Sequence, residues 1–348
     1  MQPWLAVLYN PAVNWVIALA YMLYGPVLVI YLIFKLIGFQ GYMSLFRYVE
    51  GDSFMYRLDP RVKILLSIIV TTVAAITIWW ISAIMLASVL YLYRYLSRVR
   101  EKLKIVIPLV LATFIGTAWA ESIYVPYSYL YYIFHHVTFI YLFPQVLSAI
   151  GVVEGNSNAT VLFLGHVKNP VGLTLEGIIY GLQISFRTSA AAASGMLLIF
   201  STAPPDILRS LEKSGLPIEL GFALLLAVTS IPKVLENSIT VLNAMKARGV
   251  DFMPRERNPI KAIPEAINII KMVIVTLVSI VILTLKDAGQ IAIAADIRGF
   301  RAVRRRTYYK DIRMSKVDYI ALALLIALLA IGIYISGLPG MGAIPYNP

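Results

Sequence analysis

Two segments of the chain, 50 residues apart, end in the same Arg-Gly pair. The first reads Asn243-Ala-Met-Lys-Ala-Arg-Gly249 and the second reads Ile293-Ala-Ala-Asp-Ile-Arg-Gly299. Glycine just past the last turn ends a helix readily, and an arginine in that turn interacts favourably with the helix dipole. A second interpretation is that the two ends dock in two equivalent pockets. Ala247 would let a partner approach closely, while Arg248 and Arg298 offer rigid forks of donors to carboxylates.

Residues suited to nucleotide, metal or covalent chemistry are sparse. The sequence contains neither GxxxxGK[ST] nor HExxH, and it has no Cys to form a disulfide, a thiolate ligand or a nucleophile. His135 and His136 are adjacent and so lie on different faces of a helix, and His166 falls in a predicted loop. We therefore predict no metal site. An intramembrane enzyme is disfavoured because it would need His, Asp or Glu clustered within the spans.

Arg187 is the charged residue placed deepest in an apolar segment, at the middle of Glu176–Phe200 beside the small residues Ala190–Ala193. A charge at membrane depth is costly and marks a candidate functional residue. It would pair with an acidic group or a backbone carbonyl of a neighbouring helix. A stand-alone secondary transporter would place such residues at broken helices near the midplane, and Arg187 is the one clear candidate for that alternative.

The composition identifies the elements that must position these residues as membrane helices. The chain has 348 residues, of which 59% are hydrophobic and 14% are charged. These values exclude a cytosolic enzyme, a disordered chain and a disulfide-stapled secreted domain. The net charge of +12 is uneven, because residues 201–316 hold 18 of the 30 Lys and Arg while residues 121–175 hold only Lys168. Clustered Lys and Arg beside apolar spans mark the cytoplasmic side, and no basic module outside this pattern indicates nucleic-acid binding.

We predict an all-α, polytopic helical bundle in the cell membrane, with about six spans. The expected crossings are Asn14–Phe39, a tight pair of helices within 64–93 that turns near Trp79–Trp80, 105–120, Glu176–Phe200 and Tyr319–Ser336. Charge parity requires the aromatic insertion at 121–170 to begin and end outside, as a re-entrant hairpin or an interfacial aromatic layer. The expected organisation is an extension at 1–56 with an extra span, a transmembrane region at 57–200, a cytoplasmic module at 201–316, and a last span with a short external tail at 317–348.

The cytoplasmic module is expected to contain long amphipathic helices and no span. Its apolar stretches, Leu220–Ile231 and Met272–Leu285, are of a length more typical of buried or interfacial helices. A helix that begins at Pro264 and ends near Ile297 is predicted. Glu236 is expected to be buried and to anchor its helix to a basic partner.

Several blocks of the sequence resemble, in order, the transmembrane coupling (T) component of energy-coupling-factor (ECF) transporters, a family that includes cobalt-uptake permease subunits. Leu58-Asp-Pro-Arg-Val-Lys63 resembles the family's opening LDPRxK, in which Asp59 and Pro60 also fit a helix start. The other blocks are Thr202-Ala-Pro-Pro-Asp-Ile-Leu208 with Gly215-Leu-Pro217, Ile231-Pro-Lys-Val-Leu-Glu236 leading to Ala247-Arg-Gly249, and the second Arg-Gly.

The resemblance implies a non-catalytic subunit whose two Ala-Arg-Gly helix ends dock in grooves of two cytoplasmic ATPase subunits. ATP and Mg²⁺ would bind those partners, and a small membrane substrate-binding (S) subunit would carry a vitamin or a transition-metal cation. Arg248 and Arg298 would meet acidic or carbonyl groups, Ala247 would permit close approach, and Gly249 and Gly299 would end the helices. Arg187 would either pair structurally or help to move the substrate binder. The chain departs from the family pattern at Ile297, where Ala is usual, and in its extension and insertion.

Overall fold

The computed structural model describes residues 8–37, 51, 53–156, 158–249, 259–300 and 314–342. The chain divides into two compact units. The first unit comprises Met1–Ser210 and Arg313–Pro348, and the second comprises Leu211–Ile312. The second unit thus falls within the basic segment 201–316.

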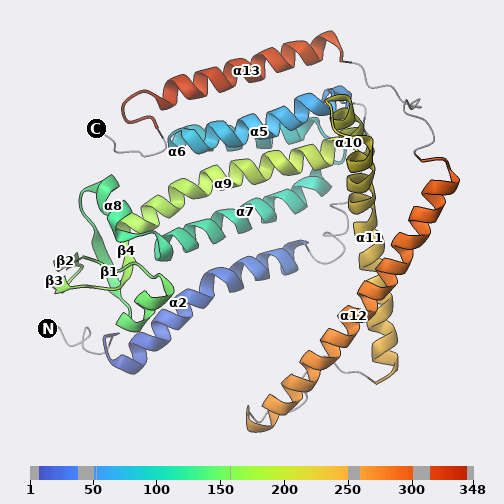
Figure 1. The fold of residues 1–348 in the computed structure, drawn as a ribbon. Helices are drawn as coiled ribbons and strands as arrows, with labels where there is room; N and C mark the ends of the chain where they lie inside the picture. Colours follow the sequence, from blue (N-terminus) through green and yellow to red (C-terminus); the bar gives the residue numbers. More distant parts are fainter. Residues whose placement is uncertain are drawn as a thin grey trace. The chain divides into compact units, whose positions relative to one another are not determined.

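The first unit is a bundle of helices that run back and forth between two ends (Figure 1). The described helices of this bundle are α2 (Pro11–Leu32), extended by a π-helical turn at Ile33–Ile37, α4 (Phe54–Arg57), α5 (Pro60–Ile76), α6 (Trp79–Leu92), α7 (Val99–Tyr124), α9 (Leu175–Ser201) and α13 (Lys316–Ser336). A 3₁₀ turn at Tyr93–Tyr95 follows α6. Helix α9 packs against α5, α6 and α7. The predicted pair of short helices turning beside Trp79 is confirmed, as is the mostly helical fold.

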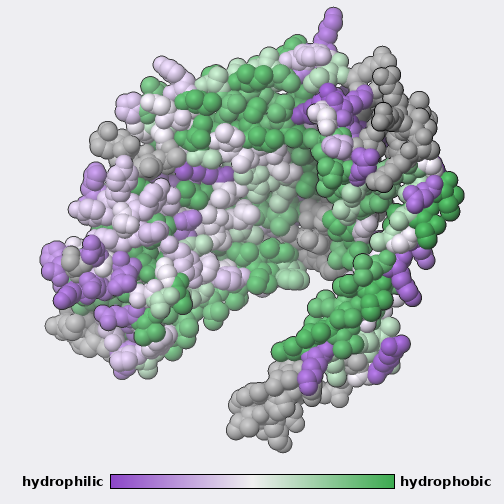
Figure 2. Space-filling model, in the orientation of Figure 1, coloured by the Kyte–Doolittle hydropathy of each residue, from purple (hydrophilic) through white to green (hydrophobic). Residues whose placement is uncertain are grey.

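Among the described residues, six helices are long and apolar enough to cross a membrane. They are Pro11–Lys35, Val99–Tyr124, Leu175–Ser201, Glu219–Ala247, Ile269–Ile297 and Lys316–Ser336. At about 1.5 Å per residue, α5 and α6 reach only about 25 and 21 Å, less than a hydrocarbon core of roughly 30 Å. Hydrophobic residues cover the first unit over α5 and α13, whereas hydrophilic residues gather around its small sheet (Figure 2).

Small side chains let α7 and α9 approach each other closely. The face of α9 toward α7 carries a small, buried residue at every fourth position, namely Gly177, Gly181, Ser185, Ser189 and Ala193. A Cβ on Gly181 would lie 2.6 Å from the Ala118 carbonyl oxygen. The Ser185 hydroxyl donates to the Phe114 carbonyl at 2.8 Å. This small-xxx-small seam is a common way for membrane helices to associate.

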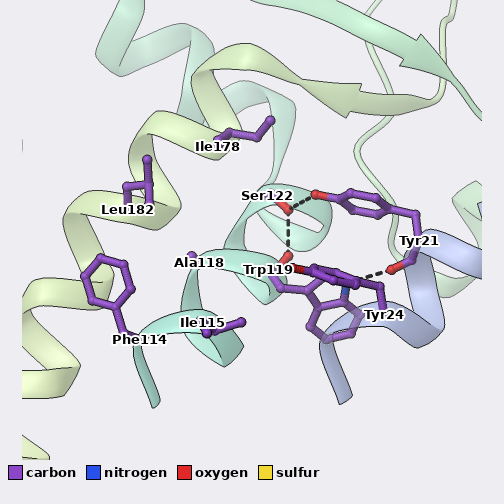
Figure 3. A pocket seen from close by; sticks show the side chains of 9 residues that line it. All are labelled: Tyr21, Tyr24, Phe114, Ile115, Ala118, Trp119, Ser122, Ile178 and Leu182. Carbon is purple, nitrogen blue, oxygen red and sulfur yellow. Dashed lines mark hydrogen bonds between the residues drawn. The ribbon is translucent and has the colours of Figure 1, made fainter. Parts of the chain in front are cut away.

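Helix α2 packs onto α7 through a notch at Gly25, where a Cβ would lie 2.1 Å from the Trp119 ring. The Trp119 indole N–H donates to the Tyr21 carbonyl at 2.8 Å, and the Tyr21 and Ser122 hydroxyls are 3.0 Å apart (Figure 3). Beside these contacts lies an apolar pocket of about 250 Å³. Its lining residues are Tyr21, Tyr24, Phe114, Ile115, Ala118, Trp119, Ser122, Ile178 and Leu182.

The insertion between α7 and α9 folds as a small module. It contains α8 (Tyr127–Phe134), β1 (Thr138–Leu142), a 3₁₀ helix (Gln145–Ile150), β2 (Asn158–Val161), β3 (Gly165–Lys168) and β4 (Gly172–Thr174). The sheet order is β3-β2-β1-β4, with β1 and β2 parallel and the other pairs antiparallel. A sheet therefore takes the place of the expected re-entrant hairpin, and an interfacial position of the aromatic residues stays a prediction. His135, at a φ of 57°, ends α8, and the buried Phe139 helps to form a separate core. The insertion begins and ends at the same end of the bundle (Figure 1), and its location outside the cell stays a prediction.

Glu176 attaches this module to α9. Its carboxylate is 2% exposed and accepts the Thr138 N–H at 2.8 Å, at the start of β1. Because Glu176→Ala would leave a buried donor unsatisfied, we expect it to lower the free energy of unfolding by about 1–3 kcal/mol. Glu176→Gln, which keeps an acceptor oxygen, should lose much less. Hydrogen exchange at the Thr138 amide checks this, and equal protection in both variants would contradict it.

The second unit is built around two long helices, α11 (Ile218–Ala247) and α12 (Pro259–Ile297), with α10 (Pro204–Lys213) leading into it. We expected no segment of spanning length and apolarity here, but two of the described helices, Glu219–Ala247 and Ile269–Ile297, are long and apolar enough to cross a membrane. Helix α11 continues through Pro232, because a single proline kinks more readily than it ends a long helix. The lysines on either side of the apolar stretch Met272–Leu285 do not interrupt α12. The long helix predicted from Pro264 is confirmed and begins earlier, at Pro259.

Candidate functional site

The first Arg-Gly pair forms the C-terminal cap of α11. The N–H of Arg248 donates to the carbonyls of Ala244 and Met245 at 3.2 and 3.1 Å. Gly249 has a φ of 85° and donates to the Lys246 carbonyl at 2.9 Å. Glycine adopts this left-handed conformation without a steric penalty, so the helix ends here.

The second pair ends α12 in the same way and completes a Schellman motif. Gly299 has a φ of 73° and donates to the Asp296 carbonyl at 2.9 Å. The Phe300 N–H donates to the Ala295 carbonyl at 3.0 Å, which is the second hydrogen bond of that motif. Both glycines therefore end their helices, and each arginine occupies the cap position before the glycine.

Both helix ends lie open on the surface of the second unit. Ala247, Arg248, Gly249, Arg298 and Gly299 are all exposed. Ile297 is also exposed, at 81%, so its bulk projects outward. An exposed guanidinium at a helix C-terminus can present its donors to an approaching carboxylate or carbonyl.

The two ends lie far apart on the crossed helices (Figure 1). The Phe300 ring, just past Arg298, lies 4.1 Å from the ring of Phe222 near the start of α11. Arg248 follows Phe222 by most of the length of α11, which places the two arginines roughly 35–40 Å apart. A pocket of about 370 Å³ adjoins the second helix end. It is lined by Phe222, Leu226, Ile291, Ala294, Ala295, Arg298 and Phe300.

An ionic contact braces α11 against α12. The Asp287 carboxylate lies 3.0 Å from the Lys233 ammonium and accepts the Asn237 amide N–H at 3.2 Å. Glu236, which we expected to be buried as the anchor, is instead exposed. The anchor is Lys233, one turn earlier on the face toward α12. The sequence offered no signal for this pairing because its partners are far apart along the chain.

Replacing Gly299 by Ala should destabilise the second end by about 1–2 kcal/mol, since a side chain at this φ is strained. Gly289→Ala is the matched control: Gly289 lies inside α12, and a Cβ there meets no atom within 4 Å. That change should stabilise the helix by about 0.5–1 kcal/mol. Hydrogen exchange of the last turn of α12 measures both, and a shift of the same sign in both variants would refute the argument.

Arg187 lies near the middle of α9, about 18 Å from the start of the helix. Its side chain is half-buried, with Tyr180 two turns earlier on the same face. The Tyr180 ring packs edge-on against Tyr129, with the centroids 5.5 Å apart. Because α9 is continuous through Arg187, this residue does not lie at a broken helix of the kind expected in a secondary transporter. Its functional role stays a prediction.

The three histidines lie in or beside the small module and do not assemble a site. The nearest described carboxylate to His136 is Glu176, with Nε2 and Oε1 3.8 Å apart. His135 caps α8, and His166 lies on β3. Within the described ranges, no group of three or more His, Asp or Glu side chains is placed to hold a metal ion.

A mostly helical chain whose described part contains six helices of spanning length belongs to the class of polytopic membrane proteins. The CbiQ family, described as cobalt transport protein, matches residues 51–309. The chain belongs to this family, and the predicted membership is confirmed.

Curated relatives extend the match over most of the chain. The energy-coupling factor transporter transmembrane protein EcfT of Streptococcus thermophilus is 27% identical over 82% of this chain and 95% of the relative. The EcfT of Bacillus subtilis is 27% identical over 83% of this chain and 96% of the relative. That of Lactococcus lactis is 24% identical, with 79% and 91% covered.

Proposed function

We propose that this chain is the transmembrane coupling component of an ECF-type, ATP-driven importer. The observation that carries the proposal is the pair of exposed, Arg-capped helix ends, roughly 35–40 Å apart on two braced helices. In this function Arg248 and Arg298 meet acidic or carbonyl groups on two cytoplasmic ATPase subunits. Ala247 allows close approach, and Gly249 and Gly299 expose the helix ends. ATP and Mg²⁺ bind to those partners, in keeping with the lack of a phosphate loop here.

The charge distribution of the first unit supports the proposal that the chain enters the second unit on the cytoplasmic side of the membrane. Basic residues gather at the end where the chain leaves the bundle, and they include Lys35, Arg57, Arg61, Lys63, Arg94, Arg98, Arg100, Lys102, Lys104, Arg209 and Lys316. The opposite end carries Lys168 on β3. Such asymmetry favours the basic end in the cytoplasm. The proposed location is therefore the cell membrane, with the small module outside.

The remaining partner is a small membrane protein that binds the substrate, a vitamin or a transition-metal cation. The description of the CbiQ family, cobalt transport protein, supports a metal cation as cargo, and the names of the EcfT relatives support assembly into an energy-coupling factor transporter. Movement of the ATPase subunits would reach that partner through α11 and α12.

Purification of the tagged chain from its own host, in mild detergent, tests the proposal. Mass spectrometry should identify nucleotide-binding subunits with the wild type and their loss from an Arg248→Glu/Arg298→Glu double variant. A small hydrophobic protein in the same sample would lead to the substrate. If the folded wild type purifies alone, the coupling function fails and a stand-alone secondary transporter takes its place.

A further inference from the structure

Strand β2 begins with the triplet Asn158-Ala-Thr160, which matches the acceptor pattern Asn-x-Ser/Thr of N-linked glycosylation. It is the one such triplet in the sequence, although the chain has ten asparagines. A triplet this short can carry a glycan only where its asparagine is exposed and lies outside the cytoplasm. Its place in the fold and in the membrane therefore decides whether it is an acceptor.

The two side chains that a glycosyltransferase must reach share the exposed face of β2. Asn158 and Thr160 are exposed, whereas Ala159 between them is 3% exposed. Ala159 and Val161 belong to the separate core of the small module, so the packed face of the strand is the opposite one. Because side chains alternate along a strand, the Asn158 amide and the Thr160 hydroxyl point away from that core. Neither has to leave a packed position to be reached.

The neighbouring strand adds two more polar residues to this surface. Strand β3 pairs antiparallel with β2 and sets Lys168 opposite Asn158 and His166 opposite Thr160. Both residues are exposed, and we call Asn158, Thr160, His166 and Lys168 the hairpin face. Hydrophilic residues gather around the small sheet as a whole (Figure 2). A glycan on Asn158 would therefore extend over polar residues and into solvent without opening the core.

The charge pattern places the small module outside the cytoplasm. Strands β2 and β3 lie at one end of the bundle, and the starts of α5 and α7 lie at the other (Figure 1). Arg61, Lys63, Lys102 and Lys104 belong to those helix starts, and clustered basic residues favour the cytoplasmic side. In this respect the inference rests on the location given under Proposed function, and it does not depend on coupling to ATPase subunits.

We infer that Asn158 is a site of N-linked glycosylation. The donor is an oligosaccharide carried on a polyprenyl phosphate or pyrophosphate, and the catalyst is a membrane oligosaccharyltransferase of the host. The Asn158 Nδ2 forms a bond to the anomeric carbon of the sugar while the bond from that carbon to the phosphate oxygen breaks. The lipid phosphate leaves with the electron pair, and Nδ2 gives up one proton to a base of the transferase. The Thr160 hydroxyl is the group by which the transferase recognises the acceptor.

A glycan at this position restricts what the small module can bind. An N-linked oligosaccharide is bulky and solubilising, and one on Asn158 covers the hairpin face, including Lys168 directly opposite. A protein partner of the module must then use another surface. Strand β3 is at the edge of the described sheet, so the glycan also hinders the addition of a strand from another chain.

Mass spectrometry of the tagged, full-length chain purified from its own host tests the inference. We expect a mass increase with the spacing of sugar units, located on Asn158 in the peptide that contains β2. Asn158→Gln and Thr160→Ala should abolish the increase, while Thr160→Ser, which keeps the hydroxyl, should retain it. Asn156→Gln is the matched control, because Asn156 is exposed two residues earlier but does not begin an acceptor triplet, so the increase should remain.

An unmodified Asn158 in the wild type would overturn the inference, and so would a mass increase that Asn158→Gln leaves unchanged. Equal loss of the sugar in Asn156→Gln and Asn158→Gln would also contradict it, because the triplet would then not determine the modification. All of these substitutions are at exposed positions, and thermal unfolding in detergent checks that each variant is folded.

A single cysteine label separates this inference from the proposed location. The chain has no native Cys, and Ala149 is exposed in the 3₁₀ helix Gln145–Ile150, outside the hairpin face. A membrane-impermeant maleimide should label Ala149→Cys in intact cells. If it does so while Asn158 is unmodified, only the glycosylation fails. If labelling requires opened cells, the proposed location fails as well, and recovery of ATPase subunits still tests the coupling function separately.

Discussion

A single charge reversal at Arg248 is expected to weaken binding of the proposed ATPase pair by about 10²–10⁴-fold. The two arginine-capped ends are carried by one braced helix pair, and they are too far apart to enter one groove. Two linked contacts make the second binding event intramolecular, so loss of either contact removes that advantage. Arg298→Glu should have a similar effect, and the double variant should bind more weakly still. Titration of nanodisc-embedded chain with the purified ATPase subunits measures these affinities.

Lys286→Glu is the matched control for this prediction. Lys286 is exposed on α12, directly before Asp287 and about three turns before the second helix end. Its replacement by Glu changes the net charge by the same amount as Arg248→Glu. It should alter affinity only slightly, in a salt-dependent manner. Equal losses in Lys286→Glu and Arg248→Glu would mean that general charge, rather than the helix ends, determines association.

Replacing Gly181 by Leu is expected to separate α7 from α9 and to lower the free energy of unfolding by about 3 kcal/mol or more. The built Cβ lies 2.6 Å from the Ala118 carbonyl oxygen and 3.2 Å from the Glu121 Cβ, and a backbone atom cannot move aside as a flexible side chain can. Because α9 also packs on α5 and α6, the loss should spread through the bundle. Thermal unfolding in detergent, followed by tryptophan fluorescence, measures the effect.

Gly195→Leu tests whether the seam itself causes that loss. Gly195 lies on the same helix, and a Cβ there meets no atom within 4 Å. Both variants add the same side chain to α9, so the difference between them isolates the contact with α7. Similar melting temperatures for the two variants would show that the close approach of α7 and α9 does not determine stability.

The features that could be predicted from the sequence are those set by local signals. Apolar length located α2, α7, α9 and α13, and paired tryptophans located the turn between α5 and α6. Asp59 as N-cap with Pro60 following it starts α5 as predicted, with the carboxylate accepting the Arg61 N–H at 2.8 Å. The glycine after each arginine located the ends of α11 and α12. In each case the determining residues are neighbours in the chain.

The features that could not be predicted depend on residues far apart in the sequence. The stretch that forms β1 is apolar after Thr138, so its period does not separate a strand from a buried helix. Its parallel partner, β2, follows only after a long connection. The Lys233–Asp287 brace likewise joins distant segments. So do the Lys63 and Lys102 ammonium groups, which donate to the Ser201 and Phe200 carbonyls at the end of α9. Arg61 and Lys63 were recognised as parts of a motif, but their acceptors in α9 and α10 could be found only in the folded chain.

The closeness of α7 and α9 where the small module is inserted has a consequence for engineering and for divergence. A Cβ on Gly177 would lie 3.2 Å from the Ser122 carbonyl oxygen, so the helix that enters the module and the helix that leaves it are already in contact. The module is therefore replaceable. A short loop could join α7 to α9 in its place without altering the direction of any later helix. The same site should accept a foreign domain as a display tag, and relatives are free to lengthen, shorten or exchange it while their bundles remain alike.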